Sequence, residues 1–306
     1  MDRRKAAGAG LAALVLTAVG GTACTRRTVA VEEPPGSDPA AVVRRAAQAL
    51  VRAGTSDVRT GMELVSGGTR LTVRGVGVFD YGRRLGRLEV SLPDGRQRPV
   101  TQVIAPGSLY MKHRGAGVPA DKWVEVDPRR LADGNLVANG ATDPLTAAEL
   151  LRGATAVRYA GAGAAEGEPV RRYTGTTDVA AAARSATGRT REQLAAAARG
   201  FPSDAVPFEV WLDAAGRPRL LRYTFAFSGA GGADGGARGG SAGGAGGAGG
   251  AGAVGGAPGE GGAGGGGPVE VVSTTELHGF GRRVAVRLPP PGDVYTGAIA
   301  VPGQRP

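Results

Sequence analysis

The chain of 306 residues has a single cysteine, Cys24, whose thiol has no second cysteine to pair with. It follows a basic start at residues 3–5, an apolar run of 14 residues at 6–19, and the small residues 21–23. A membrane-spanning helix needs about 20 apolar residues, so this run is too short to span and is typical of an export signal. The pattern predicts that residues 1–23 are removed and that the thiol of Cys24 is modified.

The same residues resemble the signal of bacterial lipoproteins. The resemblance implies a diacylglyceryl group on Cys24, cleavage just before it, and a lipid-anchored protein on the extracytoplasmic side of the cell membrane, because two acyl chains give stable attachment. Gly21 departs from this signal, which usually carries Leu three residues before the cysteine. The alternative is ordinary secretory cleavage after Ala23, which would release a secreted protein with one free thiol.

Other side chains that could do chemistry are few and scattered. The two histidines, His113 and His278, have no second ligand at metal-binding spacing, so we expect no metal site. No nucleophile elbow, Walker or dinucleotide motif stands between a strand and a helix. Glu209 and Asp213 would share one strand face, but a turn explains Asp213 better than a carboxylate pair does. We therefore expect no catalytic residues, no cofactor and no enzymatic activity.

The charge balance is basic throughout the chain. Residues 1–23 hold three basic residues and one acidic residue, so the chain from Cys24 onward carries +8 rather than +10. This charge favours contact with anionic headgroups or a polyanionic cell wall, although general use of Arg and Ala accounts for it equally well. Basic pairs such as 83–84, 171–172 and 282–283 are scattered and lack interleaved aromatic residues, so we expect no nucleic-acid binding.

The first folded element is expected to be a helix that follows a polar tether at residues 24–37. Asp38 is suited to cap the helix, Pro39 to occupy its first turn, and Gly54 to end it. The apolar residues that recur at helical spacing are Val43, Ala46, Ala47 and Leu50.

From residue 57 to residue 127 the apolar pattern changes to a period of two, which is typical of strands with one buried face. Gly and Pro turns separate short runs, so the segment predicts an antiparallel meander. After Gly75 the phase of the alternation shifts to Val76, which predicts a bulge or bend. The later strands of the meander are expected at 100–104, 109–112 and 123–126.

Two short Ala-rich helices are expected in the middle of the chain. Asp143 and the proline after it begin one that ends at Gly153, and Thr190 with Gln193 forms a capping box that begins the other. Short Ala-rich helices persist only when packed against something else. Strands are expected between the two helices, at 156–160 and 170–176.

The C-terminal part returns to strand patterns, at 208–212 and 221–227. Residues 228–267 are almost wholly Gly and Ala, so we expect disorder there because they bury too little to offset the entropy of ordering. Strand patterns resume at 269–277 and 284–288. The tract is therefore expected to be an insertion between neighbouring strands, which loop-closure entropy tolerates.

Two stretches carry a resemblance to a known family: Leu-Tyr-Met-Lys at 109–112 followed by Lys-Trp-Val-Glu-Val-Asp at 122–127, and Val-Trp-Leu-Asp at 210–213 before a long strand. With the order of the elements, they resemble the LppX/LprG family of actinobacterial lipoproteins, which is similar in fold to the LolA and LolB carriers. The resemblance implies an α+β fold in which a strongly curved antiparallel half-barrel is closed by short helices. The expected domain covers 38–290, with a C-terminal tail at 291–306.

The resemblance also implies an apolar cavity that binds or transfers the acyl chains of a lipid or glycolipid, in a protein that acts as a monomer. An ordinary packed core is the alternative for the interior. The alternative function is a structural or sensory ectodomain that binds a protein or a cell-wall polymer, because a fold alone does not decide function. Alternation gives the candidate cavity-lining residues: Leu88, Val90, Val103, Leu109, Val124, Val210, Leu212, Leu221 and Tyr223.

Overall fold

The computed structural model describes residues 36–66, 69–93, 98–115, 117–201, 205–227 and 269–297. The expected signal peptide, Cys24, most of the tether and the Gly-rich tract lie outside these residues.

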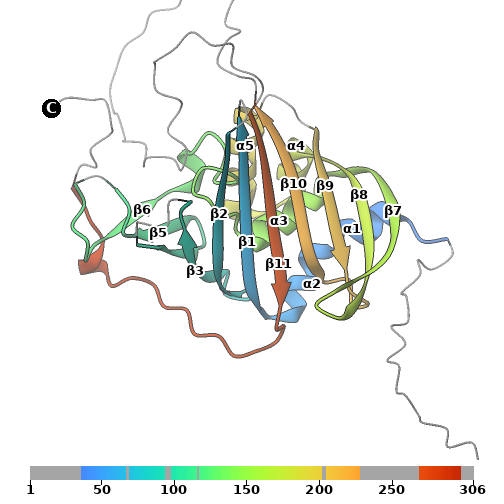
Figure 1. Ribbon diagram of the computed structural model, residues 1–306, viewed down its shortest axis with the longest axis horizontal. Helices are drawn as coiled ribbons and strands as arrows, with labels where there is room; N and C mark the ends of the chain where they lie inside the picture. Colours follow the sequence, from blue (N-terminus) through green and yellow to red (C-terminus); the bar gives the residue numbers. More distant parts are fainter. Residues whose placement is uncertain are drawn as a thin grey trace, which may run out of the picture.

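The strands of the described residues form one eleven-stranded antiparallel sheet with the order β6-β5-β4-β3-β2-β1-β11-β10-β9-β8-β7 (Figure 1). Because β6 and β7 are its two edges, the sheet is open rather than closed into a barrel. The expected α+β fold is confirmed. The strands are β1 (Thr55–Ser66), β2 (Thr69–Asp80), β3 (Leu85–Ser91), β4 (Val100–Ala105), β5 (Ser108–Lys112), β6 (Trp123–Val126), β7 (Ala154–Ala165), β8 (Glu168–Asp178), β9 (Ala205–Leu212), β10 (Pro218–Phe227) and β11 (Val269–His278).

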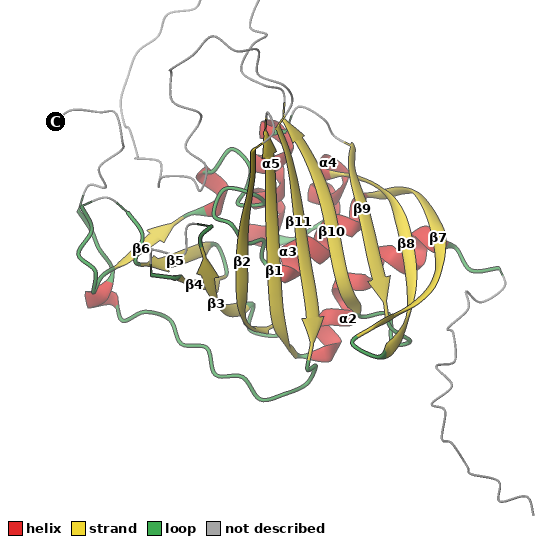
Figure 2. Ribbon diagram, in the orientation of Figure 1, coloured by secondary structure: helices red, strands yellow, loops and turns green. Residues whose placement is uncertain are grey.

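The α-helices of the described residues lie together on one face of the long strands, here called the inner face, and Figure 2 shows them behind the sheet. The opposite face is called the outer face. The helices are α1 (Pro39–Arg44), α2 (Ala46–Ala53), α3 (Pro144–Leu150), α4 (Val179–Ser185) and α5 (Gly188–Gly200), with 3-10 turns η1 (Pro128–Arg130), η2 (Leu151–Gly153) and η3 (Pro291–Asp293).

The caps of the first and third helices are confirmed. The side chain of Asp38 accepts a hydrogen bond from a first-turn N–H at 2.9 Å, and Asp143 does the same at 2.9 Å at the start of α3. Gly54, at a φ of 80°, ends the first helical segment as expected, because a left-handed residue there costs glycine little. The expected single helix is divided at Arg45 into α1 and α2.

The expected capping box at Thr190 is wrong. Helix α5 begins earlier, at Gly188, and Thr190 lies inside it. The hydroxyl of Thr190 accepts a hydrogen bond from Arg84 at 2.8 Å, and the amide of Gln193 donates one to the carbonyl of Gly134 at 2.7 Å. Both side chains therefore serve contacts with distant segments instead of the local helix end. Helix α4, which was not among the expected elements, precedes α5.

The expected bulge at Gly75 is also wrong, since β1 and β2 pair without a shift of register. Gly75 and Gly77 lie on the inner face, where a Cβ on the first would overlap the hydroxyl of Thr60 and a Cβ on the second the carbonyl of Arg87. The valines between and after them lie on the outer face, and Val76 is 55% exposed. The apparent change of phase arises because glycine, not a bulge, occupies the inner positions of a closely packed strand pair.

One hydrophobic cluster joins the inner face to the helices. Within it, Phe201 stacks on Phe225 with ring centroids 5.1 Å apart, and Phe225 on Tyr223 at 6.1 Å. The hydroxyl of Tyr223 donates a hydrogen bond to the carbonyl of Ala147 in α3 at 2.6 Å, which satisfies its one polar group inside the core. The aromatic row thus fixes α3 and the end of α5 against β10.

The strands that flank the Gly-rich tract pair with each other. Phe227 at the end of β10 lies opposite Val269 at the start of β11. The expectation that the tract connects neighbouring strands is therefore confirmed. The strands expected at 156–160 and 170–176 are found within the longer β7 and β8.

The strand expected at 284–288 is wrong. Strand β11 pairs with β1 on one side and β10 on the other, so its continuation has no free sheet edge to join. The chain instead crosses the outer face beside β3 to β6, and Figure 1 shows this segment running from β11 to η3 beside β6. There Val286 packs with Leu85, Val103 and Trp123 in a second cluster, and Val294 forms a single bridge with Trp123.

Candidate functional site

The candidate lining residues fall mostly on the inner face. Eight of them belong to the cluster shared with the helices, and each is at most 2% exposed. Val103 is the exception, because it faces the outer side of β4, while Val100 and Ile104 of the same strand face the helices. The eight inner-face residues are Leu88, Val90, Leu109, Val124, Val210, Leu212, Leu221 and Tyr223.

These eight residues come from two separate parts of the sheet. One group lies on β3, β5 and β6, and the other on β9 and β10, with β2, β1 and β11 between them. Val58, Val73 and Val271 on those central strands belong to the same cluster. The apolar layer is therefore continuous across the sheet, and the side chains of sheet and helices fill it by packing against each other.

The part of the helix layer formed by α4 and α5 presents mainly alanine to this core. From α4 the buried side chains are Val179, Ala182 and Ala183, and from α5 the largest is Leu194. An alanine methyl contributes about 0.8 kcal/mol on burial, against roughly 1.5–3 kcal/mol for a leucine or valine. Burial consequently holds these two helices to the sheet less strongly than it would hold Leu-rich helices.

A hollow of about 430 Å³ lies between α4 and α5, which pack against each other. Its floor adjoins the main cluster, because Ala183 belongs to that cluster and Ala195 and Ala198 pack against it. Arg184 and Arg191 also line the hollow. The arrangement can take hydrocarbon against the methyl groups and an anionic group beside the two arginines.

The two arginines of this hollow differ in how firmly they are held. The Nε of Arg191 donates to the carbonyl of Ala186 at 2.8 Å, so its guanidinium also caps the end of α4. Arg184 is exposed at the last turn of that helix. A cation at a helix C-terminus is electrostatically favourable. Because the helix end carries only a partial negative charge, the two arginines keep positive charge that a ligand can meet.

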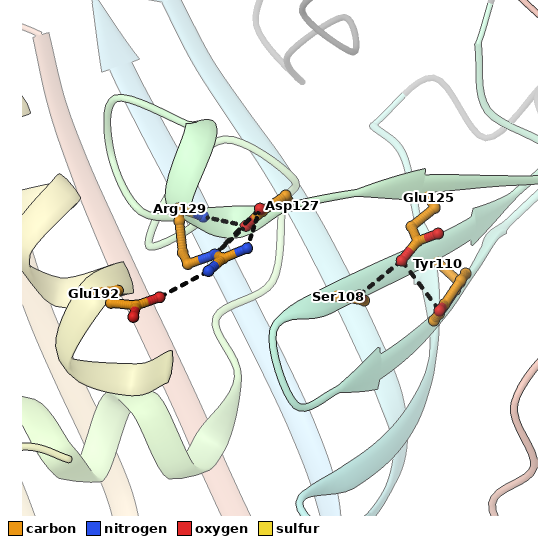
Figure 3. A network of polar contacts seen from close by, with 6 residues as sticks. All are labelled: Ser108, Tyr110, Glu125, Asp127, Arg129 and Glu192. Atoms are coloured by element: carbon orange, nitrogen blue, oxygen red, sulfur yellow. Dashed lines mark hydrogen bonds and ion pairs between the residues drawn. The ribbon is translucent and has the colours of Figure 1, made fainter. Parts of the chain in front are cut away.

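Polar contacts hold α5 on the side away from this hollow. Arg129 lies between Asp127 and Glu192 and donates to each carboxylate at 2.7 Å, as Figure 3 shows. The side-chain hydrogen bond from Arg129 holds the pKa of Asp127 below its usual range, although partial burial acts in the opposite direction. The contacts made by Thr190 and Gln193 tie the same half of α5 to loops at the end of the sheet.

The hollow was missed at the level of sequence because none of its residues alternates or carries a large apolar side chain. None of the nine candidate residues lines it. The available signal was the spacing of small residues, Ala180 with Ala183 and Ala195 with Ala198, each three positions apart on a helix. That spacing has meaning only once α4 is known to be a helix.

The carboxylates considered for catalysis have structural partners. Asp213 accepts from the backbone N–H groups of Ala215 and Arg217 at 3.0 and 2.9 Å, which confirms its role in the turn. Glu209 accepts from Trp211 at 2.7 Å and pairs with Arg172. Among the residues that the structure describes, no group of three or more His, Cys, Asp or Glu could hold a metal ion. Within the same residues, no helix has the length and apolar character needed to cross a membrane.

The outer face carries a polar hollow of about 630 Å³ over the central strands β2, β1, β11 and β10. Arg59, Arg74 and Arg222 line it, with Glu63 and Glu276 and several threonines between them. Gly61, which lacks a side chain, also lines it and leaves open space at its position. This surface lies on the opposite side of the sheet from the helices and suits a polar, charged partner.

No protein-family model matches the sequence, and no curated protein matches it. Among solved structures, the chain is similar to the lipoprotein LppX of Mycobacterium tuberculosis, with 11% identity and a TM-score of 0.42 over 82% of this chain and 100% of that chain. LprF of Mycobacterium bovis has 11% identity and a TM-score of 0.36, over 82% of this chain and 96% of that chain. A LolA-superfamily protein of Nitrosomonas europaea has 8% identity and a TM-score of 0.29, over 79% of this chain and 94% of that chain. These neighbours are of the kind that the sequence resembles, and at such values the likeness assigns a role to no residue of this chain.

Proposed function

We propose that this chain is an extracytoplasmic lipoprotein, anchored through Cys24, that binds the acyl chains of a lipid or glycolipid at α4 and α5. The observation that carries the proposal is the hollow between these helices, whose alanine floor adjoins the apolar layer over the sheet. The two arginines beside it suit an anionic headgroup. Binding here requires α4 and α5 to separate further, so that the acyl chain reaches the apolar layer between these helices and the sheet.

The energetics favour such an exchange. Each methylene of an acyl chain gains about 0.8 kcal/mol on transfer from water, so ten methylenes supply roughly 8 kcal/mol. Opposing this gain is the loss of the contacts that α4 and α5 make with the core, and these are mainly alanine contacts. A helix pair with few large buried side chains opens at a lower free energy than the core strands do.

The proposal is tested by acyl-probe binding with a variant that fills the hollow. Ala195→Trp places an indole over the hollow, and we expect at least a tenfold loss of affinity for a fluorescent fatty-acyl probe. Ala226→Trp is the matched control, because Ala226 is exposed on the outer face of β10, and it should bind as the parent does. Mass spectrometry of the protein purified from membranes should also find a bound lipid. An empty protein that takes up no probe contradicts the proposal.

The anchor has its own test, which is independent of the ligand. Cys24→Ser removes the thiol that would be acylated, so the protein should move from the membrane fraction to the soluble or secreted fraction. Retention of the variant in the membrane fraction would show that the chain is held there by something other than a lipid on Cys24.

A second candidate function rests on the polar hollow of the outer face. Three arginines there, with threonines between them, suit an acidic cell-wall polymer, which would make the chain a surface-binding ectodomain. Arg74→Glu should then abolish sedimentation with purified wall material while leaving acyl-probe binding unchanged. If the parent protein takes up no probe and Arg74→Glu abolishes wall binding, this second function replaces the first.

A further inference from the structure

A separate hollow of about 310 Å³ lies at the tip of the β7–β8 hairpin, where the turn at Glu166 reaches Arg59 on the outer face of β1. This volume is at the small end of the range for ligand sites. Trp211 and Leu220 supply apolar wall, and Arg219 and His278 supply polar wall. The hollow is on the opposite side of the sheet from α4 and α5, so an inference drawn from it does not depend on lipid binding.

Arg219 is unusually buried for a residue with so few polar partners. Its side chain is 9% exposed, and its guanidinium lies 5.5 Å from the ring centre of Phe280. Its ion pair with Glu166 is long, at 3.8 Å, and its Nε has no hydrogen-bond partner among the described residues. His278 also lines the hollow, and its buried Nδ1 likewise has no hydrogen-bond partner among the described residues. Buried polar atoms without partners are costly, so a polar group that enters the hollow and pairs with them gains free energy.

A carboxylate of the chain itself already occupies part of this site. Glu166 accepts a hydrogen bond from Arg59 at 2.6 Å with one oxygen and faces Arg219 with the other. Glu166 lies in a tight turn with Gly167, both at positive φ, and its side chain is 46% exposed. The two guanidinium groups are therefore spaced to hold one carboxylate between them, and the carboxylate now there can turn outward into solvent.

We propose that this hollow binds a small carboxylate with an apolar body, whose carboxylate replaces that of Glu166 between Arg59 and Arg219. The apolar body lies against Trp211 and Leu220. Once Glu166 has turned outward, the two arginines face one remaining carboxylate of the hollow, that of Glu276, which leaves one positive charge. A monovalent carboxylate balances this charge, whereas a divalent phosphate exceeds it.

The two histidines of the chain provide the measurement. The ring signals of His278, which lines the hollow, report the site by NMR, and those of His113, beyond the other half of the sheet, are the internal reference. We expect 3-phenylpropionate to shift the His278 signals saturably and to leave those of His113 in place. The neutral 3-phenylpropanol and inorganic phosphate should shift neither. Equal shifts with the alcohol, or none with the carboxylate, would overturn the proposal.

Variants separate this site from a general effect of charge. Arg219→Leu should weaken 3-phenylpropionate binding at least tenfold, while Arg222→Leu on the same strand, outside this hollow, should leave it unchanged. Glu166→Gln removes the competing carboxylate and should strengthen binding several-fold, which a merely structural role of the turn does not explain. If Arg219→Leu fails to fold, Glu166→Gln still decides, because unchanged or weaker binding in that variant contradicts the proposal.

Discussion

At the scale of single residues, glycines on the inner face determine how closely the central strands approach. Gly77 has the backbone carbonyl of Arg87 where a Cβ would stand, and backbone cannot move aside as the end of a long side chain can. Gly61, on the outer face of the neighbouring strand β1, has open space where its Cβ would stand. The two glycines therefore differ in whether the fold needs them.

Gly77→Ala should be strongly destabilising because its methyl group forces β2 and β3 apart. We expect a loss of roughly 2–4 kcal/mol in the free energy of unfolding. Gly61→Ala should change it by less than about 1 kcal/mol, and in the stabilising direction, because alanine restricts the unfolded chain. Urea unfolding curves of the two variants measure the difference. Equal effects would mean that the strand pair does not depend on the missing side chain.

At the scale of elements, alternation predicted strands well and faces less well. It placed Leu88 and Val210 on the inner face, because charged residues break the apolar run on the other side of their strands, Arg87 and Glu89 on β3 and Glu209 on β9. It failed at Val103 because β4 is buried on both sides. A segment more than 180 residues later covers its outer side, and only the folded chain brings that segment there. Helix α4 is mostly a run of Val and Ala and has no apolar periodicity, so it was not predicted. The hollow that it forms with α5 could therefore not be predicted either.

The ion pair between Asp127, which caps η1, and Arg129 should make stability depend on pH on the acid side. Arg129 lowers the pKa of Asp127 in the folded state, so the stabilisation is present above the unfolded pKa of an Asp and is lost as the pH falls through the lower folded value. Asp127→Asn removes this dependence and keeps an acceptor for the cap. The stability difference between parent and variant, from urea midpoints at pH 3 to 6, should be small because the pair is partly exposed, and it should shrink as the pH falls toward 3. A difference that persists unchanged at pH 3 would exclude this pair as its source.

At the scale of the whole molecule, the two faces of the sheet are closed in different ways. Helices cover the inner face, whereas the C-terminal segment covers the outer face of β3 to β6. The N–H of Tyr295 donates to the carbonyl of Trp123 at 2.7 Å, and Lys122 donates to the carbonyl of Gly292 at 2.9 Å. The polar hollow over β2, β1, β11 and β10 has no residue of the C-terminal segment in its lining.

Removing the C-terminal segment after residue 282 should therefore affect one face only. Trp123 is 8% exposed beneath that segment, so its fluorescence should shift to longer wavelength on truncation, measured with Trp211→Phe in both proteins so that one indole emits. The melting temperature should fall because the cluster around Val286 is lost. Acyl-probe binding should be unchanged, since α4 and α5 lie across the sheet. A truncated protein whose Trp123 emission wavelength is unchanged but which no longer binds the acyl probe would show that the two faces are coupled through the sheet.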